Sequence, residues 1–252
     1  MKEELLKIEN LSAGTEDKLI LKNINLSINY GEVHVIMGPN GSGKTTLANL
    51  IMANPKYIVK DGDIKMDGKS IMDLTTDKRA KEGLFMSFQS PMAVSGISVE
   101  NFIRTAIQER SEENISFVKF RKKLYAEMDE LKMDHSYAER YLNLGFSGGE
   151  KKKNEILQLL MINPKLAILD ETDSGLDVDA TRIVSKGIER FHNKDNGVLI
   201  ITHHQELVRN VVPDFVHVII DGRIVKTGDA SLVEKIERDG FNWIREEVEL
   251  GK

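Results

Sequence analysis

The sequence contains no cysteine, only one tryptophan and only five prolines among its 252 residues. Without thiols the chain can form neither disulfides nor thiolate metal sites. No apolar run approaches the roughly 20 residues that a membrane-spanning helix needs, and the N-terminus has no apolar signal segment. We therefore expect a cytoplasmic protein without direct membrane insertion.

Basic residues are also fewer than acidic ones. The chain has 35 Lys and Arg against 40 Asp and Glu, which gives a net charge of −5. Nucleic-acid-binding domains normally carry an excess of basic residues, so this balance argues against a nucleic-acid partner.

The hydrophobic pattern predicts a β-rich first third. Alternating apolar residues over 5–11 and 19–28 are typical of strands, and so is the apolar run 33–37. The dipeptide Asp67-Gly68 predicts a hairpin turn. In the last third the apolar runs 166–169 and 198–201 predict buried parallel strands.

Two amphipathic helices are expected between these β-rich parts, with Ser98 and Ser116 as their N-caps. Their apolar stripes are Val99, Phe102, Ile103, Ala106 and Ile107 in the first helix, and Phe117, Phe120, Leu124, Met128 and Leu131 in the second. The length of the chain allows one large domain with a full core, or a domain with a subdomain. We interpret the two helices as a subdomain inserted into a β/α core.

One stretch fits the phosphate-binding pattern G-x-x-x-x-G-K-[ST] and lies between a predicted strand and a predicted helix. The candidate nucleotide-binding residues in this stretch are Gly38, Pro39, Asn40, Gly41, Ser42, Gly43, Lys44, Thr45 and Thr46. The glycines allow the backbone N–H groups to face a phosphate chain at the positive end of the helix. Lys44 would reach the β- and γ-phosphates, and the hydroxyl of Thr45 would bind Mg²⁺.

Two acidic residues, Asp170 and Glu171, follow the apolar strand 166–169. The carboxyl end of a strand in an α/β sheet is where ligands bind, and the phosphate-binding loop ends another strand. Asp170 would hold Mg²⁺, and Glu171 would orient and polarise the attacking water.

A second anion-binding segment is predicted at the start of another helix. It consists of Ser147, Gly148, Gly149 and Glu150. A hydroxyl and two glycines at a helix N-terminus can bind phosphate, although an ordinary N-cap has a similar composition. One nucleotide needs one phosphate cradle, so two cradles suggest a nucleotide held between two copies of the chain.

In their order along the chain these motifs resemble those of ATP-binding-cassette ATPases. The resemblance implies that Gln89 is the Q-loop residue that senses Mg²⁺, that Asp177 ends the D-loop, and that His203 contacts the γ-phosphate. It implies an α/β P-loop NTPase with a mixed β core, an N-terminal antiparallel β part and an inserted α-helical subdomain. As a single domain over 1–252, it would divide into a core of 1–89 and 160–252 and a helical subdomain of 90–159.

Three departures from the transporter pattern resemble the SufC family, the ATPases of the Suf iron–sulfur cluster assembly system. They are Phe-Ser-Gly-Gly-Glu followed by three lysines, Glu-Thr-Asp in place of Glu-Pro-Thr, and Phe-Gln-Ser-Pro in the Q-loop. The resemblance implies ATP and Mg²⁺ as cofactors, a transient ATP-dependent dimer, and SufB- and SufD-like partners bound near residues 90–110. Iron–sulfur clusters are mostly held by thiolates, so a cysteine-free subunit would act on a partner that carries them.

Two alternatives remain: the nucleotide-binding subunit of a membrane transporter, and a soluble cassette protein of DNA repair or translation. An aromatic residue that could stack on adenine is also missing near Thr15, Glu16 and Asp17.

The lysine run 151–153 has two interpretations. It forms a solvated helix face, or one of its lysines pairs with Glu171 and slows hydrolysis in the isolated subunit.

Overall fold

The computed structural model describes residues 3–110, 116–172, 174–202 and 205–250. Within these ranges one sheet is antiparallel, with the strand order β2-β1-β4-β5. Its strands are β1 (Glu4–Gly14), β2 (Leu19–Asn29), β4 (Ile58–Met66) and β5 (Lys69–Ser70). The predicted hairpin at Asp67-Gly68 is confirmed, because Met66 pairs with Lys69 across that turn.

The second sheet has the strand order β10-β9-β3-β8-β7-β6. Its strands are β3 (Val33–Met37), β6 (Leu84–Ser87), β7 (Leu166–Asp170), β8 (Gly197–Ile201), β9 (Phe215–Ile220) and β10 (Arg223–Gly228). All neighbouring strands are parallel except β9 and β10. The carboxyl ends of β3, β6, β7 and β8 therefore meet at one edge of the sheet.

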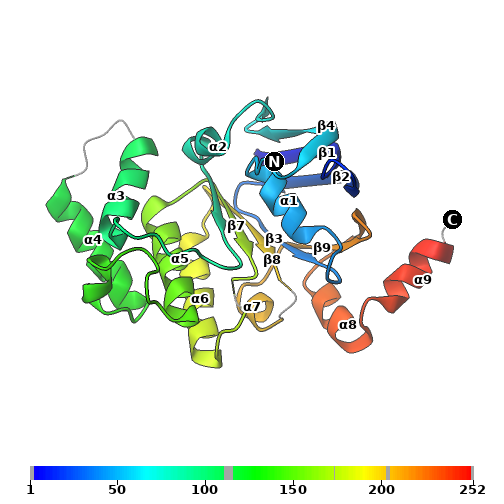
Figure 1. Ribbon diagram of the computed structural model, residues 1–252. Helices are drawn as coiled ribbons and strands as arrows, with labels where there is room; N and C mark the ends of the chain where they lie inside the picture. The colour runs from blue at the N-terminus through cyan, green and yellow to red at the C-terminus, as the bar shows by residue number, and fades with distance from the viewer. Residues whose placement is uncertain (1–2, 111–115, 173, 203–204, 251–252) are drawn as a thin grey trace.

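The helices divide into those that pack on the sheets and those that form the helical part. They are α1 (Lys44–Ile51), α2 (Thr76–Glu82), α3 (Val99–Arg110), α4 (Phe117–Glu130), the 3₁₀ helix η1 (His135–Ala138), α5 (Gly148–Ile162), α6 (Val178–Phe191), α7 (Gln205–Asn210), α8 (Ser231–Asp239) and α9 (Asn242–Leu250). Figure 1 shows α3 and α4 on the side of the molecule opposite the antiparallel sheet. The expected fold class is confirmed by this combination of two sheets and an inserted helical part.

The core has two parts, one on each face of the parallel strands. One part lies between the two sheets and includes α1, with Ile36, Leu47 and Ile168 among its buried residues. The other joins the opposite face of the sheet to α3, α4, α5 and α6. The boundary predicted between residues 159 and 160 falls inside α5, so that helix connects the helical part to the core without a linker.

The predicted stripe of the second middle helix is correct except at its first residue. Phe117 is 41% exposed, whereas Phe120 and Leu124 are buried. The ring of Phe117 lies instead beside the guanidinium groups of Arg104 and Arg121. The predicted cap Ser116 holds the N-cap position of α4 but makes no side-chain hydrogen bond to that helix.

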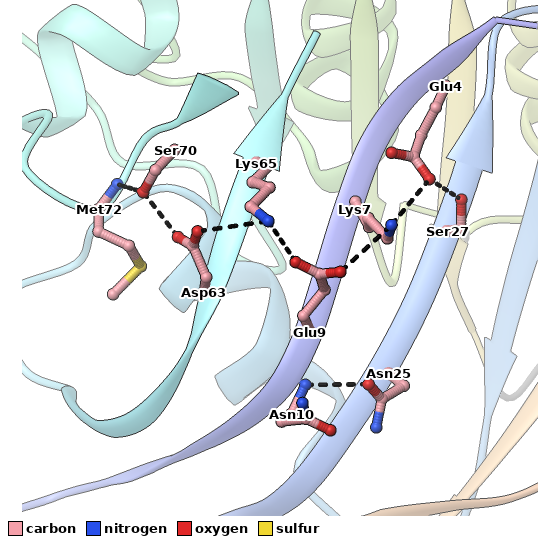
Figure 2. A network of polar contacts seen from close by, with 10 residues as sticks. All are labelled: Glu4, Lys7, Glu9, Asn10, Asn25, Ser27, Asp63, Lys65, Ser70 and Met72. Carbon is pink, nitrogen blue, oxygen red and sulfur yellow. Dashed lines mark hydrogen bonds and ion pairs between the residues drawn. The ribbon is translucent and has the colours of Figure 1, made fainter. Parts of the chain in front are cut away.

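The outer face of the antiparallel sheet carries alternating charges from neighbouring strands (Figure 2). Glu9 on β1 forms ion pairs with Lys65 on β4 and with Lys7, the latter at 3.2 Å. Lys65 also lies 3.9 Å from Asp63. Opposite charges on neighbouring strands stabilise the strand pairing and keep this face of the sheet polar. The opposite face of the antiparallel sheet packs on the core.

Candidate nucleotide-binding site

The phosphate-binding loop connects β3 to α1 at the carboxyl edge of the parallel strands. Gly38 must be a glycine for packing reasons, since a Cβ there would lie 2.1 Å from the carbonyl oxygen of Ile219. Gly43 is the N-cap of α1 with φ 109°, and no side chain caps that helix. The first backbone N–H groups of α1 are therefore left for a ligand to satisfy.

A buried hydroxyl in this loop has no partner among the described residues. Ser42 is 4% exposed, and its Oγ makes no hydrogen bond. A buried polar atom without a partner is costly, and such atoms are rare in folded proteins. The residues present thus fit a phosphate chain, which would supply the missing hydrogen-bond acceptor.

Lys44 points back into the same loop. Its Nζ donates to the carbonyl oxygens of Gly38 at 2.8 Å and Pro39 at 3.0 Å. Burial lowers the pKa of Lys44, while the carboxylates of Glu171 and Asp170 oppose that shift. A buried cation held only by carbonyl groups is well placed to exchange them for the charged oxygens of a phosphate.

Asp170 ends β7 beside the loop, and Thr45 Oγ1 donates to its Oδ1 at 3.4 Å. Burial raises the pKa of Asp170 to about 6; the hydrogen bond from Thr45 opposes the rise, Glu171 adds to it, and Lys44 and Lys152 oppose it. A hydroxyl and a carboxylate this close together are suitable ligands for Mg²⁺. No cluster of three or more His, Asp or Glu that could hold a metal occurs in the described part of the chain. Mg²⁺ is usually bound by one or two carboxylates together with water and substrate phosphates.

Glu171 adopts a backbone conformation that is unusual for a residue other than glycine, with φ 47°. Its N–H donates to the carbonyl of Ile201 on β8 at 2.8 Å, which stabilises this turn. Gln89, after the end of β6, donates from Nε2 to Glu171 Oε2. Strained backbone at such a position is typical of functional sites, where it fixes the direction of a side chain.

Part of the phosphate-binding loop lines a cavity of about 570 Å³ together with Gln89 and Glu171, while Gly38, Ser42 and Asp170 are not among its lining residues. Its lining residues are Lys18, Ile20, Asn40, Gly41, Gly43, Lys44, Thr45, Thr46, Gln89 and Glu171. Lys18 and Ile20 were not among the residues predicted for this site. Both follow positions 15–17, where no aromatic ring for adenine is present, and the pairing of β1 with β2 brings them to the loop.

Other predicted site residues do not line this cavity in the described structure. Ser147 caps α5 and forms a capping box with Glu150, whose other carboxylate oxygen accepts the hydroxyl of Tyr137. Asp177 caps α6 by accepting the N–H of Ala180 at 2.7 Å. His203 and its neighbour lie outside the described residues. The nucleotide roles of all these residues stay predictions.

Two lysines of the run 151–153 have partners other than the predicted Glu171. Lys152 pairs instead with Glu155 at 3.3 Å. Lys153 donates to the carbonyl of Lys132 at 3.3 Å. The interpretation of the lysine run as a solvated helix face is wrong at Lys152, which is only 4% exposed.

A phosphate-binding loop, an acidic pair and a carboxyl-edge cavity define a P-loop nucleotide-binding protein. The family model described as ABC transporter matches residues 21–174. The chain therefore belongs to the ABC transporter family, as an ATP-binding subunit with an ATP-hydrolysing cassette.

Similar proteins match over nearly the whole chain. "Vegetative protein 296" of Bacillus subtilis (strain 168) is 51% identical over 245 residues, which are 96% of this chain and 94% of that protein. "Probable ABC transporter ATP-binding protein SpyM3_0208" of Streptococcus pyogenes serotype M3 (strain ATCC BAA-595 / MGAS315) is 50% identical, covering 97% and 96%. "Probable ATP-dependent transporter ycf16" of Cyanophora paradoxa is 44% identical, also covering 97% and 96%.

Solved structures agree with the fold. The ADP conformation of MJ1267, an ATP-binding cassette of an ABC transporter, has a TM-score of 0.73 at 26% identity, covering 94% of this chain and 95% of that one. A dimeric post-hydrolysis state of the cassette MJ0796, bound to ADP and Pi, has a TM-score of 0.77 at 21% identity, covering 90% and 99%. At that identity the second likeness shows the fold alone.

Proposed function

We propose that this chain is the ATPase subunit of an iron–sulfur cluster assembly complex in the cytoplasm, working with SufB- and SufD-like scaffold proteins. The observation that supports a protein partner is an exposed apolar surface beside Gln89, here called the Q-loop patch, and the choice of scaffold proteins rests on the three motif departures from the transporter pattern. It consists of Phe88, Met92, Val94, Tyr141 and Leu144, which are 58%, 78%, 42%, 48% and 46% exposed. Exposed apolar side chains gathered in this way are typical of protein–protein contact surfaces.

The two segments that carry the Q-loop patch are hydrogen-bonded to each other. The N–H of Val94 donates to the carbonyl of Leu142 at 2.9 Å, and Asn143 donates to the carbonyl of Met92 at 3.1 Å. A partner that covers this surface would also touch the residue next to Gln89, and so would sense the nucleotide cavity.

The proposed chemistry uses groups that line the cavity together with others predicted to act beside it. Lys44, the loop N–H groups and the Ser42 hydroxyl would bind the phosphates of ATP. Mg²⁺, held by Thr45, Asp170 and Gln89, would neutralise charge on the phosphate oxygens. Glu171 would accept a proton from the attacking water, and His203 would contact the γ-phosphate.

The glycines at the start of α5 support a nucleotide shared between two copies. A Cβ added at Gly148 or Gly149 would meet nothing within 4 Å. Neither glycine needs a left-handed backbone, so nothing within this chain requires a glycine at either position. A close approach of phosphate from a second copy would require both, and Ser147 would then face the γ-phosphate of that copy's ATP.

The relatives' printed names favour a second candidate, the ATP-binding subunit of a membrane transporter. The described residues contain no helix that is both long and apolar enough to cross a membrane. The membrane subunits of a transporter could also bind the Q-loop patch, and the two candidates therefore differ in the identity of the partner.

Affinity purification of the tagged chain from its native cell, in detergent, separates the two candidates. We expect soluble partners that contain cysteine to copurify, and Met92→Glu to abolish their capture. Val212→Glu is the matched control, because Val212 is 73% exposed outside the Q-loop patch. Copurification of an integral membrane protein in place of soluble partners would contradict the proposal and support the transporter reading.

A further inference from the structure

A buried ion pair on α5 lies behind the Q-loop, outside the nucleotide cavity. Lys152 and Glu155 are each 4% exposed, and Lys152 Nζ lies 3.3 Å from Glu155 Oε2. Burying two charges is costly unless their remaining hydrogen-bonding capacity is satisfied. A pair of this kind is therefore a weak source of stability, and its other contacts indicate what it does.

Those other contacts are both made to the backbone of Phe88. Lys152 Nζ donates to the carbonyl oxygen of Phe88 at 2.7 Å, and the N–H of Phe88 donates to Glu155 Oε1 at 2.7 Å. Charge-assisted hydrogen bonds are about twice as strong as neutral ones. Both backbone groups of the residue before Gln89 are thus fixed by one ion pair.

A second polar contact fixes the far end of the same loop. Asn154, fully buried on α5, donates from Nδ2 to Asn143 Oδ1 at 2.9 Å. Asn143 in turn donates from Nδ2 to the carbonyl of Met92 at 3.1 Å. Helix α5 therefore holds the Q-loop backbone at Phe88 and at Met92, on either side of Gln89.

We propose that Lys152 and Glu155 are positioning residues for ATP hydrolysis, which hold the backbone beside Gln89 so that its side chain stays at the nucleotide cavity, and which link it to the phosphate-binding segment at the start of α5. The same helix begins at Gly148 and carries the ion pair within its first turns. A shift of Phe88 is therefore transmitted to Ser147 as a movement of one rigid element. The inference needs only the ATPase activity of the chain and does not depend on the iron–sulfur proposal.

A double-mutant cycle in the full-length chain tests this role. Lys152→Met keeps most of the side-chain volume and removes the ammonium group that holds Phe88. We expect kcat for ATP hydrolysis to fall by at least about tenfold, with KM for ATP changed by less than about threefold. In a Gln89→Ala background the same substitution should lower kcat by less than about twofold, because the residue through which it acts is already absent.

Lys153→Met is the matched control on the same helix. Its ammonium group contacts the carbonyl of Lys132 and not the Q-loop, so kcat should stay within about twofold of the parent in both backgrounds. Where Lys152→Met alone does not fold, Lys152→Met with Glu155→Met removes both buried charges, and the cycle is run with that pair. Equal losses of kcat with and without Gln89, or no loss at all, would overturn the proposal.

Discussion

The side-chain amide of Gln89 donates from Nε2 to the carboxylate of Glu171 at Oε2, and so connects the loop after β6 to the carboxyl end of β7. Glu171 is predicted to activate water and Gln89 to sense Mg²⁺. Gln89 therefore occupies part of the hydrogen-bonding capacity of the Glu171 carboxylate. If Gln89 turns toward Mg²⁺ when ATP is present, its hydrogen bond to this oxygen of Glu171 is lost.

The first prediction concerns Glu171→Gln. A glutamine keeps an oxygen that can accept the Gln89 hydrogen bond, so the local structure should persist while proton acceptance is lost. We expect turnover to fall by about 10²–10⁴-fold, the usual contribution of a general base, with ATP affinity within about threefold. Steady-state hydrolysis and nucleotide-binding titrations measure the two effects. A variant that retains more than about a tenth of the turnover would exclude Glu171 as the base.

Ser42→Ala should have opposite effects on the free and the ATP-bound protein. Removing a buried hydroxyl that has no partner should leave the free chain as stable as before or raise its free energy of unfolding by about 1 kcal/mol. The same change should weaken ATP binding by about tenfold or more, through loss of a hydrogen bond to a charged phosphate. Thermal unfolding with and without ATP gives both numbers. Destabilisation of the free chain would show that the hydroxyl has a structural partner.

A buried histidine pair predicts how stability depends on pH. His217 Nε2 lies 2.9 Å from His34 Nδ1, and His34 Nε2 lies 3.0 Å from Glu32 Oε2. Burial, with a further contribution from His34, lowers the pKa of His217 from 6.5 to about 4. Between these values the unfolded chain binds a proton that the folded chain does not. The free energy of unfolding should therefore decrease as the pH falls from 6.5 to 4, by up to about 3 kcal/mol.

Denaturant unfolding at several pH values checks this slope. His217→Gln should reduce the loss of stability between pH 6.5 and 4, whatever its effect at neutral pH. His135→Gln is the control, because the side chain of His135 is 44% exposed beside Asp129. An unchanged slope in His217→Gln would mean that other groups cause the pH dependence.

Much of the fold could be predicted from local patterns. The strand 33–37 was predicted with its correct bounds, because an apolar run between Glu32 and Gly38 allows few alternatives. Helix α1 begins at Lys44, before its first buried apolar residue Leu47, since its first turn continues the phosphate-binding loop. Periodicity detects only the part of a helix that packs on the core.

The interactions that pair distant residues could not be predicted in this way. Nothing in a run of three lysines indicates that only Lys152 turns inward to meet Glu155 and Phe88. The left-handed backbone of Glu171 depends on its contact with Ile201 of a neighbouring strand. Such features follow from the arrangement of α5, β7 and β8 in space, which a local pattern does not contain.

The central claim is that ATP is held between two copies of this chain, and the oligomeric state of Glu171→Gln tests it most directly. With saturating ATP and Mg²⁺, light scattering should show the mass of a dimer, and Ser147→Arg in the same background should restore the monomer. If Glu171→Gln binds ATP and remains monomeric alone and with its captured partners, ATP does not join two copies and the account is wrong.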